Sequence, residues 1–513
     1  MSIDLQPHQP PLDAADIDPV PTLRALLTRR RFIGALGAGG ATALLTACSS
    51  SGTGELPGAS APSAPSFVQP ESITSAEGLL EVTLRAEPAH VPWGESTRYA
   101  YTYNGSSPGP TLRLRPGDRL VVHLENGLDA DTNIHTHGLH VSPSGDADNI
   151  FVRVAPGESR TYVYDIPSDH RSGLFWYHPH AHGTVAKQVT AGLAGAIVIV
   201  DDLDDIPEVA TAIERIWILS DPAIGDGPDV LEAGPMDQMA GRVGDTVLAN
   251  GIQRPDVDAE AGTLERWRMV NASSSSYYRL ALEGHPLHVI ASDGGRLNGP
   301  VAVEEILLAP GERTEFFVTP STAGSFALRT LRYDRGSTGM GDNMMGGSSL
   351  VDGDAVLASF TVTGDRQPAN LPTTLLNASQ FTLPAPDASR LLELGMAMGG
   401  GMMGGGMGEM MSFTVDGKTF DSDRTDIAVR AGRVEAWEIR NTSPMDHPFH
   451  LHVWPFLVAA GPSTAGWKDT INVPAGESVN ILVPFSGLTG RTVYHCHILD
   501  HEDLGMMGVI DVS

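Results

Sequence analysis

Four histidine pairs of the form His-x-His are the residues of this chain whose types and spacing could do chemistry. The pairs are His135 with His137, His178 with His180, His450 with His452, and His495 with His497. In an extended strand the side chains of residues i and i+2 share a face, so each pair directs two imidazoles to the same side. Imidazole is a good ligand for copper, zinc, iron or nickel. Because eight imidazoles are too many for one ion and suit three, the pattern predicts a cluster of transition-metal ions.

The histidine pairs fall into two matching parts of the chain. His135 lies nine residues after Asn126, and His450 lies nine residues after Asn441. In each part the second pair follows after a similar interval. A single pair is more often structural than ligating. Four pairs at matched positions predict instead a metal cluster held between two related domains.

One of the two cysteines among the 513 residues, Cys496, lies between His495 and His497. The alternation of side chains along a strand turns its sulfur to the face opposite these histidines. Three more candidate ligands can meet it on that face: His447, just before the 450/452 pair, His501, five residues after the cysteine, and Met506, ten residues after it. Two histidines, a cysteine and a weak axial methionine form the ligand set of blue-copper electron-transfer sites. We therefore expect Cys496 to connect an electron-accepting copper to the histidine cluster through its own covalent bonds.

Short alternating strands, separated by many of the 57 glycines and 37 prolines, must position these ligands from about residue 75 onward. Three segments align without gaps: "GDRLVVHLEN" (117–126), "GTLERWRMVN" (262–271) and "GRVEAWEIRN" (432–441). A shared turn follows each of them: "APGES" (155–159), "APGER" (309–313) and "PAGES" (474–478). The repeats predict an all-β protein with three homologous domains. The middle copy has Arg279 and Leu280 where a histidine pair would fall, so the outer two domains should hold the metals.

The length of the chain also suits about three domains. We predict a first domain over residues 75–205, a second over 206–370 and a third over 371–513. Residues 1–47 are predicted to be an export signal, and residues 48–74 a flexible tether rich in serine, glycine and proline.

The N-terminal segment is typical of a targeting signal rather than of a folded domain. "TRRRFIGALGAGGATALLTAC" (28–48) has paired arginines and an apolar run too short to span a bilayer, and it resembles a twin-arginine export signal. It ends at Cys48 in a sequence that resembles a bacterial lipoprotein cleavage box, with a plain peptidase site as the alternative. We expect an exported protein, in the cell envelope on the periplasmic side or outside, anchored through an acylated Cys48.

The formal net charge of −29 restricts the partners. It argues against nucleic acid and anionic membrane surfaces, and it favours attraction of cations. Simple solvation is the alternative explanation of the charge. We expect a monomer whose contact with the membrane runs only through the N-terminal lipid.

Four motifs carry a resemblance to a known family. "HTHG", "WYHPHAHG", "HPFHLH" and "HCHILDHEDLGMM" resemble the copper-binding motifs of the three-domain multicopper oxidases, and "NGSSPGPTLRLRPGD" (104–118) is similar to the opening of their first domain. The likeness runs from about residue 75 to the end of the chain, and all the ligands are present. This disfavours the copper-free structural relatives of the fold.

The resemblance implies three cupredoxin-like Greek-key β-sandwich domains and four copper ions per chain. It assigns the type-1 copper to His447, Cys496, His501 and the axial Met506. It assigns the type-2 copper to His135 and His450. It assigns the type-3 pair to His137, His178, His180, His452, His495 and His497. The family oxidises one-electron donors at the type-1 copper and reduces O2 to water at the other three.

Two acids are expected to deliver the protons that O2 reduction consumes. Glu502 follows the type-1 ligand His501 and resembles the acid that serves the type-3 side. Asp148 resembles the acid near the type-2 copper, with Asp146 as a competing choice because this loop looks about two residues longer than the family pattern. Solvated loop carboxylates are the alternative for either position.

Methionine-rich segments are the best indication of the electron donor, because thioether sulfur prefers Cu(I). One segment, 395–411, contains Met396, Met398, Met402, Met403, Met407, Met410 and Met411. The other, 339–345, contains Met340, Met344, Met345 and the acid Asp342. Copper-efflux oxidases carry such inserts and seat Cu(I) with a methionine and an acid before the first type-1 histidine. Met445 matches that methionine, Ser443 replaces the acid, and Asp446 lies beside it.

Three hypotheses follow for the activity. The first is a Cu(I) oxidase that serves copper tolerance. The second is a laccase-like oxidase of phenols and aromatic amines, with the methionine segment as a lid. The third is a copper-sequestering envelope lipoprotein. The first is preferred because of the methionine segments.

Overall fold

The computed structural model describes residues 65–94, 96–200, 202–224, 230, 232–336, 354–375, 383–398, 411–459 and 466–513. The predicted signal segment, Cys48 and most of the predicted tether lie outside these residues. Among the described residues, no helix has the length and apolar character needed to cross a membrane.

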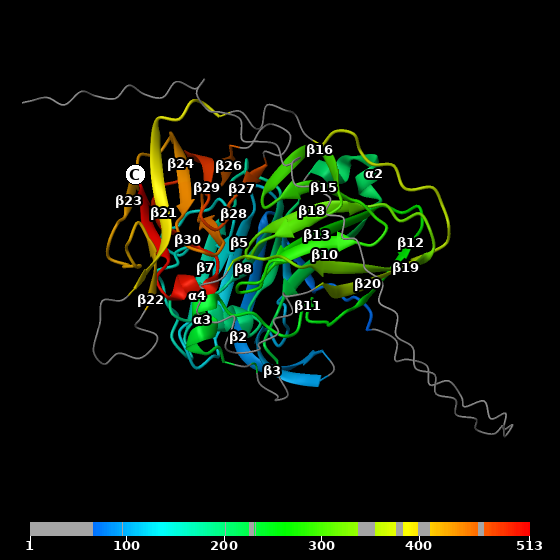
Figure 1. Ribbon diagram of the computed structural model, residues 1–513, viewed down its shortest axis with the longest axis horizontal. Coiled ribbons are helices and arrows are strands. Elements are labelled where there is room, and N and C mark those ends of the chain that lie inside the picture. The colour runs from blue at the N-terminus through cyan, green and yellow to red at the C-terminus, as the bar shows by residue number, and fades with distance from the viewer. Residues whose placement is uncertain are drawn as a thin grey trace, which may run out of the picture. The chain divides into compact units, whose positions relative to one another are not determined.

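Strands dominate the described chain and form six sheets, two in each predicted domain, which confirms the all-β prediction (Figure 1). The sheets of the first domain have the strand orders β1-β4-β9-β8-β6 and β3-β2-β5-β7. The strand bounds are β1 Ser72–Thr74, β2 Leu79–Trp93, β3 Ser96–Tyr103, β4 Thr111–Leu114, β5 Arg119–Asn126, β6 His135–His137, β7 Ser159–Asp165, β8 Gly173–His178 and β9 Gly195–Ile199.

The second domain, green in Figure 1, has sheets of order β11-β10-β13-β18-β15-β16 and β12-β20-β19-β14-β17. Its strand bounds are β10 Ile213–Ser220, β11 Leu248–Ala249, β12 Asp256–Glu260, β13 Glu265–Asn271, β14 Tyr278–Leu282, β15 Leu287–Ser292, β16 Gly295–Val303, β17 Ile306–Leu308, β18 Arg313–Val318, β19 Gly324–Leu331 and β20 Ala355–Thr363.

The third domain, yellow to red in Figure 1, has sheets of order β22-β21-β24-β29-β26-β27 and β23-β31-β30-β25-β28. Its strand bounds are β21 Ala388–Met398, β22 Met411–Val415, β23 Ile427–Val429, β24 Arg433–Asn441, β25 His447–Leu451, β26 Phe456–Val458, β27 Trp467–Lys468, β28 Thr470–Val473, β29 Ser478–Phe485, β30 Gly490–Cys496 and β31 Met507–Val512.

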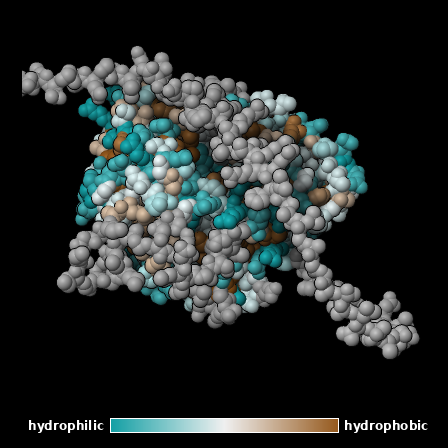
Figure 2. Space-filling model, viewed as in Figure 1, coloured by the Kyte–Doolittle hydropathy of each residue, from teal (hydrophilic) through white to brown (hydrophobic). Residues whose placement is uncertain are grey.

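The helices of the described chain are short. They are α1 Val185–Thr190, α2 Pro207–Ala210, α3 Pro235–Ala240 and α4 Leu499–Asp503, with a 3-10 turn η1 at Asp202–Asp205. Each domain has its own apolar core between its two sheets. A separate buried cluster of residues from β8, β9, β10 and β13 joins the first domain to the second. The described part of the face in Figure 2 is mainly hydrophilic, as a chain with a net charge of −29 requires.

The three aligned sequence segments occupy the same place in their sheets. They form β5, β13 and β24. Each pairs in parallel with an earlier strand of its domain, β2, β10 or β21, and antiparallel with the strand that follows the shared turn, β7, β18 or β29. Alternate residues of β5 point into the core, as the period of two predicted.

The asparagine that closes each segment explains its recurrence. Asn126, Asn271 and Asn441 each donate both amide hydrogens to two backbone carbonyls, at 2.7–2.9 Å. Each also accepts a backbone N–H from the residue two positions on. The asparagine therefore fixes the chain as it leaves the strand. In the outer domains this chain leads directly into the first histidine pair.

Candidate metal centres

The four histidine pairs begin on equivalent strands of the first and third domains, and His180, His452 and His497 lie just beyond the strand ends. In the first domain β6 carries His135 beside His178 of β8, and in the third β25 carries His450 beside His495 of β30. All eight histidines are buried, with no more than 1% of any residue exposed. The matched spacing in the sequence therefore becomes a matched position in two sheets.

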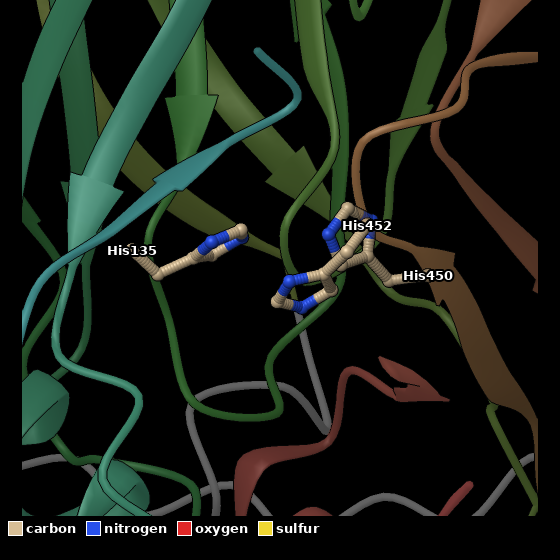
Figure 3. Close-up of side chains that lie close together, drawn as sticks. All are labelled: His135, His450 and His452. Atoms are coloured by element: carbon tan, nitrogen blue, oxygen red, sulfur yellow. The ribbon is translucent and has the colours of Figure 1, made fainter. Parts of the chain in front are cut away.

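The two outer domains bring their imidazoles face to face. His135 stacks on His452 with ring centroids 3.9 Å apart, and His137 stacks on His450 at 3.8 Å. Figure 3 shows the ring of His135 approaching those of His450 and His452 from the opposite strand. Each stack joins one histidine of the first domain to one of the third, which brings the predicted ligands into one shared cavity.

The imidazole nitrogens lie close enough to share ions. Three groups of three histidines have ligand atoms within 4.8 Å of one another: His135 with His450 and His452, His135 with His137 and His178, and His180 with His452 and His495. His497 belongs to none of these groups. Its ring lies 5.0 Å from that of His137 and 5.7 Å from that of His178.

Ring nitrogens without hydrogen-bond partners indicate whether the histidine cluster suits metal ions. His135 Nε2, His137 Nδ1, His178 Nε2, His450 Nε2 and both nitrogens of His497 are buried without a hydrogen-bond partner among the described residues. Buried polar atoms without partners are rare and costly in proteins. Several unpaired nitrogens around one cavity are the arrangement that transition-metal ions would satisfy, so the residues fit such ions.

The other ring nitrogens are held by the surrounding chain. His135 Nδ1 lies 2.9 Å from Asp148 Oδ2, His450 Nδ1 donates to the carbonyl of Asp469 at 2.8 Å, and His178 Nδ1 donates to its neighbouring proline carbonyl at 2.8 Å. Such bonds select the tautomer and orient the free nitrogen toward a metal. Asp469, which follows β27, could not be predicted from the sequence, because no regular spacing relates it to the histidine pairs.

Cys496 lies where the strand alternation predicted, on the face of β30 opposite its flanking histidines. Its sulfur is 3.3 Å from His447 Nδ1 and 3.9 Å from His501 Nδ1. Met506 is fully buried in the same core cluster. Burial raises the pKa of the Cys496 thiol, so the metal-free protein holds a proton there that a bound metal ion must displace.

The outer nitrogens of the two histidines beside Cys496 are also bonded. His447 Nε2 and Ser443 Oγ are 2.8 Å apart. His501 Nε2 donates to the carbonyl of Met239, in α3 of the second domain, at 3.2 Å. Met239 could not be predicted from the sequence, because the contact joins residues that are far apart in the chain.

The described ends of both methionine-rich segments lie beside this cysteine site. Met398 pairs with Met411 where β21 meets β22, and Phe413 of β22 stacks on His501 with ring centroids 3.7 Å apart. The backbone of Gly336, the last described residue before the other segment, bridges that of Met445. Seven of the candidate methionines and the acid lie outside the described residues: Met340, Met344, Met345, Met402, Met403, Met407, Met410 and Asp342.

The described substrate candidates are less accessible than the sequence suggested. Met445 is 1% exposed, and Met396 is half-buried against the core of the third domain. The Asp446 carboxylate accepts hydrogen bonds from the Tyr333 hydroxyl at 2.6 Å and from the Asn472 amide at 2.9 Å. Asp446 is therefore already held in place by the protein.

Known protein families match this chain in three consecutive parts. Family models described as multicopper oxidase match residues 86–204, 227–355 and 398–513. A multicopper oxidase of Staphylococcus haemolyticus is 32% identical over 423 residues, which cover 80% of this chain and 83% of that protein. This chain belongs to the multicopper oxidase family. The predicted family and its cupredoxin-like fold are confirmed.

Other relatives of this multicopper oxidase have different names. A laccase of Bacillus subtilis is 28% identical over 80% of this chain and 90% of the laccase. A cell division protein, FtsP, of Yersinia pestis is 30% identical over 94% of this chain and 98% of that protein. A solved multicopper oxidase from Campylobacter jejuni, described as a metallo-oxidase, has a TM-score of 0.74 at 30% identity and covers 87% of this chain and 96% of that one. The family implies copper, O2 and a substrate electron donor, and leaves the donor open.

The structure separates the two acids that competed for one role in the oxidase. The Asp148 carboxylate is 1% exposed and accepts the backbone N–H of Thr136 at 2.8 Å, beside His135. Asp146 has a side chain that is 70% exposed and pairs with Arg160 at 2.7 Å. Burial raises the pKa of Asp148 to about 7. Asp148 therefore has the position and the pKa of a group that could exchange protons with the cavity.

Glu502 of α4 lies between two of the cavity histidines. Its two carboxylate oxygens are 3.4 Å from His180 Nδ1 and 3.1 Å from His495 Nδ1. Burial raises its pKa well above the usual value. The next residue, Asp503, accepts backbone N–H groups of Gly183 and Ala186 at the start of α1, which fastens α4 to the first domain.

The buried histidines predict an acid-labile metal-free oxidase. Burial lowers the pKa of His178 to about 3 and that of His495 to about 4. The unfolded chain binds these protons near pH 6.5 and the folded chain does not, so the free energy of unfolding should fall as the pH drops below about 6.5, by about 2 kcal/mol per group at pH 5. Asp148 acts in the opposite sense, because its raised pKa weakens the fold as the pH rises from about 4 to about 7.

Urea unfolding of the metal-free protein at a series of pH values measures this dependence. His178→Gln should reduce the slope of the free energy of unfolding against pH below about pH 6.5, because it removes one buried ring that only the unfolded chain protonates there. A urea midpoint that stays constant between pH 7 and pH 5 would contradict the neutral, buried state of the cavity histidines.

Proposed function

We propose that this oxidase takes single electrons from Cu(I) at the Cys496 site and passes them to the histidine cavity, where O2 is reduced to water. The observation that carries the proposal is the position of Cys496, whose sulfur faces His447 and His501 while both its chain neighbours face the cavity. Four copper ions per chain would supply the redox chemistry when bound. The residues that would hold them are His447, Cys496, His501 and Met506 for type 1; His135 and His450 for type 2; and His137, His178, His180, His452, His495 and His497 for type 3.

The chain itself provides the path between the two sites. From Cys496 the backbone leads to His495 on one side and to His497 on the other, so with copper bound at both sites these covalent bonds would supply a path for an electron. The carbonyl of Cys496 also accepts a hydrogen bond from His495 Nδ1 at 3.0 Å. One strand thus fixes the separation of the two sites, which favours fast transfer over a constant distance.

The cavity also needs protons, four for each O2. Asp148 and Glu502 are the proposed carriers on the two sides of the cavity, because both are buried, both contact its histidines and burial raises the pKa of both. A carboxyl group whose pKa is raised toward neutrality can hold a proton and release it at the pH of the reaction.

Replacement of the bridging ligand tests the oxidase itself. Cys496→Ser should abolish the blue absorption, expected near about 600 nm for such a site. It should also lower O2 uptake more than about a hundredfold, because even the outer partners of metal ligands are worth about 10- to 100-fold.

Cys48→Ser is the matched control, since it removes the other cysteine and should leave both properties unchanged. Blue colour and full O2 uptake in Cys496→Ser would refute the proposed function.

Three observations favour Cu(I) as the donor. The described residues that flank the methionine-rich segments, at the ends of β21 and β22 and at Gly336, lie beside the cysteine site. The net charge of −29 attracts cations. The similar Campylobacter jejuni structure is described as a metallo-oxidase. We propose Met445, Asp446 and the methionines of both segments as the Cu(I)-binding residues, with a role in copper tolerance.

Laccase-like oxidation of phenols is the second candidate, favoured by the similarity to a laccase. Direct contact of a phenol with the cysteine site is restricted in the described residues, because His447 and His501 are fully buried and α3 covers the outer nitrogen of His501. A copper-sequestering protein that turns over little O2 is the third.

Two variants distinguish these donors. One replaces residues 399–410 by a short Gly-Ser turn between β21 and β22. The other keeps the length and changes Met402, Met403, Met407 and Met410 to leucine. In both, kcat/KM for Cu(I) in O2 uptake should fall at least about tenfold, equivalent to about 1.4 kcal/mol of transition-state stabilisation. Turnover of a phenol should stay constant or increase.

Unchanged Cu(I) turnover in the leucine variant would refute Cu(I) binding by this segment. Copper bound without O2 uptake in the parent protein would support sequestration instead.

We further propose that the protein is exported by the twin-arginine route and anchored in the cell envelope through Cys48, as a monomer. The N-terminal sequence motif supports the route and the anchor. Cys48→Ser should release the protein from the membrane fraction if the anchor is used.

A further inference from the structure

Arg313, the first residue of β18, joins all three domains although the second domain has no histidine pair. Its guanidinium donates two hydrogen bonds to the Asp469 carboxylate of the third domain, from Nη1 to Oδ1 at 2.6 Å and from Nη2 to Oδ2 at 2.5 Å. Its Nε donates to the carbonyl of Leu174, in β8 of the first domain, at 3.2 Å. Arg313 is 1% exposed and Asp469 is 2% exposed.

Asp469 continues this contact to the cavity histidines. Its Oδ1 is 3.1 Å from His137 Nε2, and its carbonyl accepts a hydrogen bond from His450 Nδ1 at 2.8 Å. The hydroxyl of Thr470 lies 3.1 Å from the same nitrogen of each histidine. With these nitrogens occupied, His137 Nδ1 and His450 Nε2 are the nitrogens left to face the cavity, and both lack another partner.

The repeated turn shows that Arg313 is a departure of the second domain from the shared pattern. The turn reads "APGES" in the first domain, "APGER" in the second and "PAGES" in the third. In the outer domains the last residue of the turn is Ser159 or Ser478, and both are exposed. The copy without histidine pairs therefore has a long, buried cation where the other copies have a short, exposed hydroxyl.

Two glycines leave room for the arginine and its turn. A Cβ on Gly138, which follows the His135–His137 pair, would lie 2.5 Å from Arg313 Nη2 and 2.6 Å from Asp469 Oδ2. A Cβ on Gly311, within the turn, would lie 2.7 Å from the ring of His497. Both glycines also have positive φ, at 87° and 82°. A glycine of the first domain and a glycine of the second therefore permit the turn to approach the histidines closely.

Asp293 binds the backbone of both members of the Arg313–Asp469 pair. Its Oδ1 accepts the backbone N–H of Arg313 at 2.9 Å, and its Oδ2 accepts that of Asp469 at 3.2 Å. Asp293 therefore fixes the backbones of Arg313 and Asp469 relative to each other, independently of the contact between their side chains. A planar guanidinium that binds a carboxylate through two parallel bonds then leaves Asp469 little freedom to rotate.

We propose that Arg313 is a positioning residue for the trinuclear site, which acts through Asp469 to set the orientation of His137 and His450. The inference rests on the proposed function, since it assumes copper in the histidine cavity. It gives the second domain an indirect part in the reaction: the domain supplies the cation that, through Asp469, fixes one histidine from each of the other two domains.

Three variants of the full-length, copper-loaded protein test this role. Arg313→Met removes the charge at similar length, and Arg313→Lys keeps the charge without the two-pronged geometry. Arg268→Met is the matched control, because Arg268 is also 1% exposed and its guanidinium pairs with Glu315 at 2.8 Å within the second domain. For each we would measure the blue absorption, copper retained under a chelator, and the spin-resonance spectrum of the type-2 copper.

Arg313→Met should keep the blue absorption, lose copper from the cavity about 10- to 100-fold more readily and show an altered type-2 spectrum. Arg313→Lys should lie between it and the parent. Arg268→Met should lower the unfolding temperature and leave the type-2 spectrum as in the parent. If Arg313→Met fails to fold, Asp469→Asn, which keeps the side-chain volume, should give the same separation of the two signals.

Copper retention and a type-2 spectrum like those of the parent in Arg313→Met would overturn the inference. So would equal loss of the blue absorption and the type-2 signal, because that pattern indicates general destabilisation. A parent protein that lacks both signals would refute the proposed function instead.

Discussion

The burial of eight imidazoles away from solvent is the constraint on which the rest of this structure depends. Burial keeps these rings neutral by lowering their pKa values, so their free nitrogens can accept a metal ion. Burial also makes a wrongly oriented ring destabilising, because a buried nitrogen that loses its partner cannot form a hydrogen bond with solvent instead. Carbonyls and carboxylates of the surrounding chain therefore hold the second nitrogen of several of these rings, among them His135, His178 and His450.

The three repeated domains contribute differently to the orientation of these rings. The outer domains place histidines at equivalent positions of β6, β8, β25 and β30, and their rings meet in two cross-domain stacks. The second domain keeps the strand order and the closing asparagine and has no histidine pair. Its contributions come from the edges: the Arg313 turn contacts the cavity, and α3 covers His501. A domain without metal ligands can thus still shape both sites.

The sequence predicted those parts of the site that depend on local geometry. The His-x-His pairs and the opposite orientation of Cys496 follow from the period of two along a strand, and both lie as expected. Asp469, Arg313 and Met239 could not be found in this way, because each acts across a domain boundary on a residue far away in the chain. The sequence favours Asp148 and leaves Asp146 as a competing choice, because the loop is about two residues longer than the family pattern. Only the fold shows that one is buried beside His135 and the other is paired at the surface.

Helix α4 places three consecutive side chains in three different environments: His501 at the cysteine site, Glu502 against the cavity histidines, and Asp503 on the amides of α1. A rotation of this single turn would displace all three at once. A change within α4 that alters the surroundings of His501 would therefore also disturb the histidine cavity. Changes in α3 or in the β21–β22 hairpin, which contact His501 from outside α4, leave Glu502 and Asp503 in place.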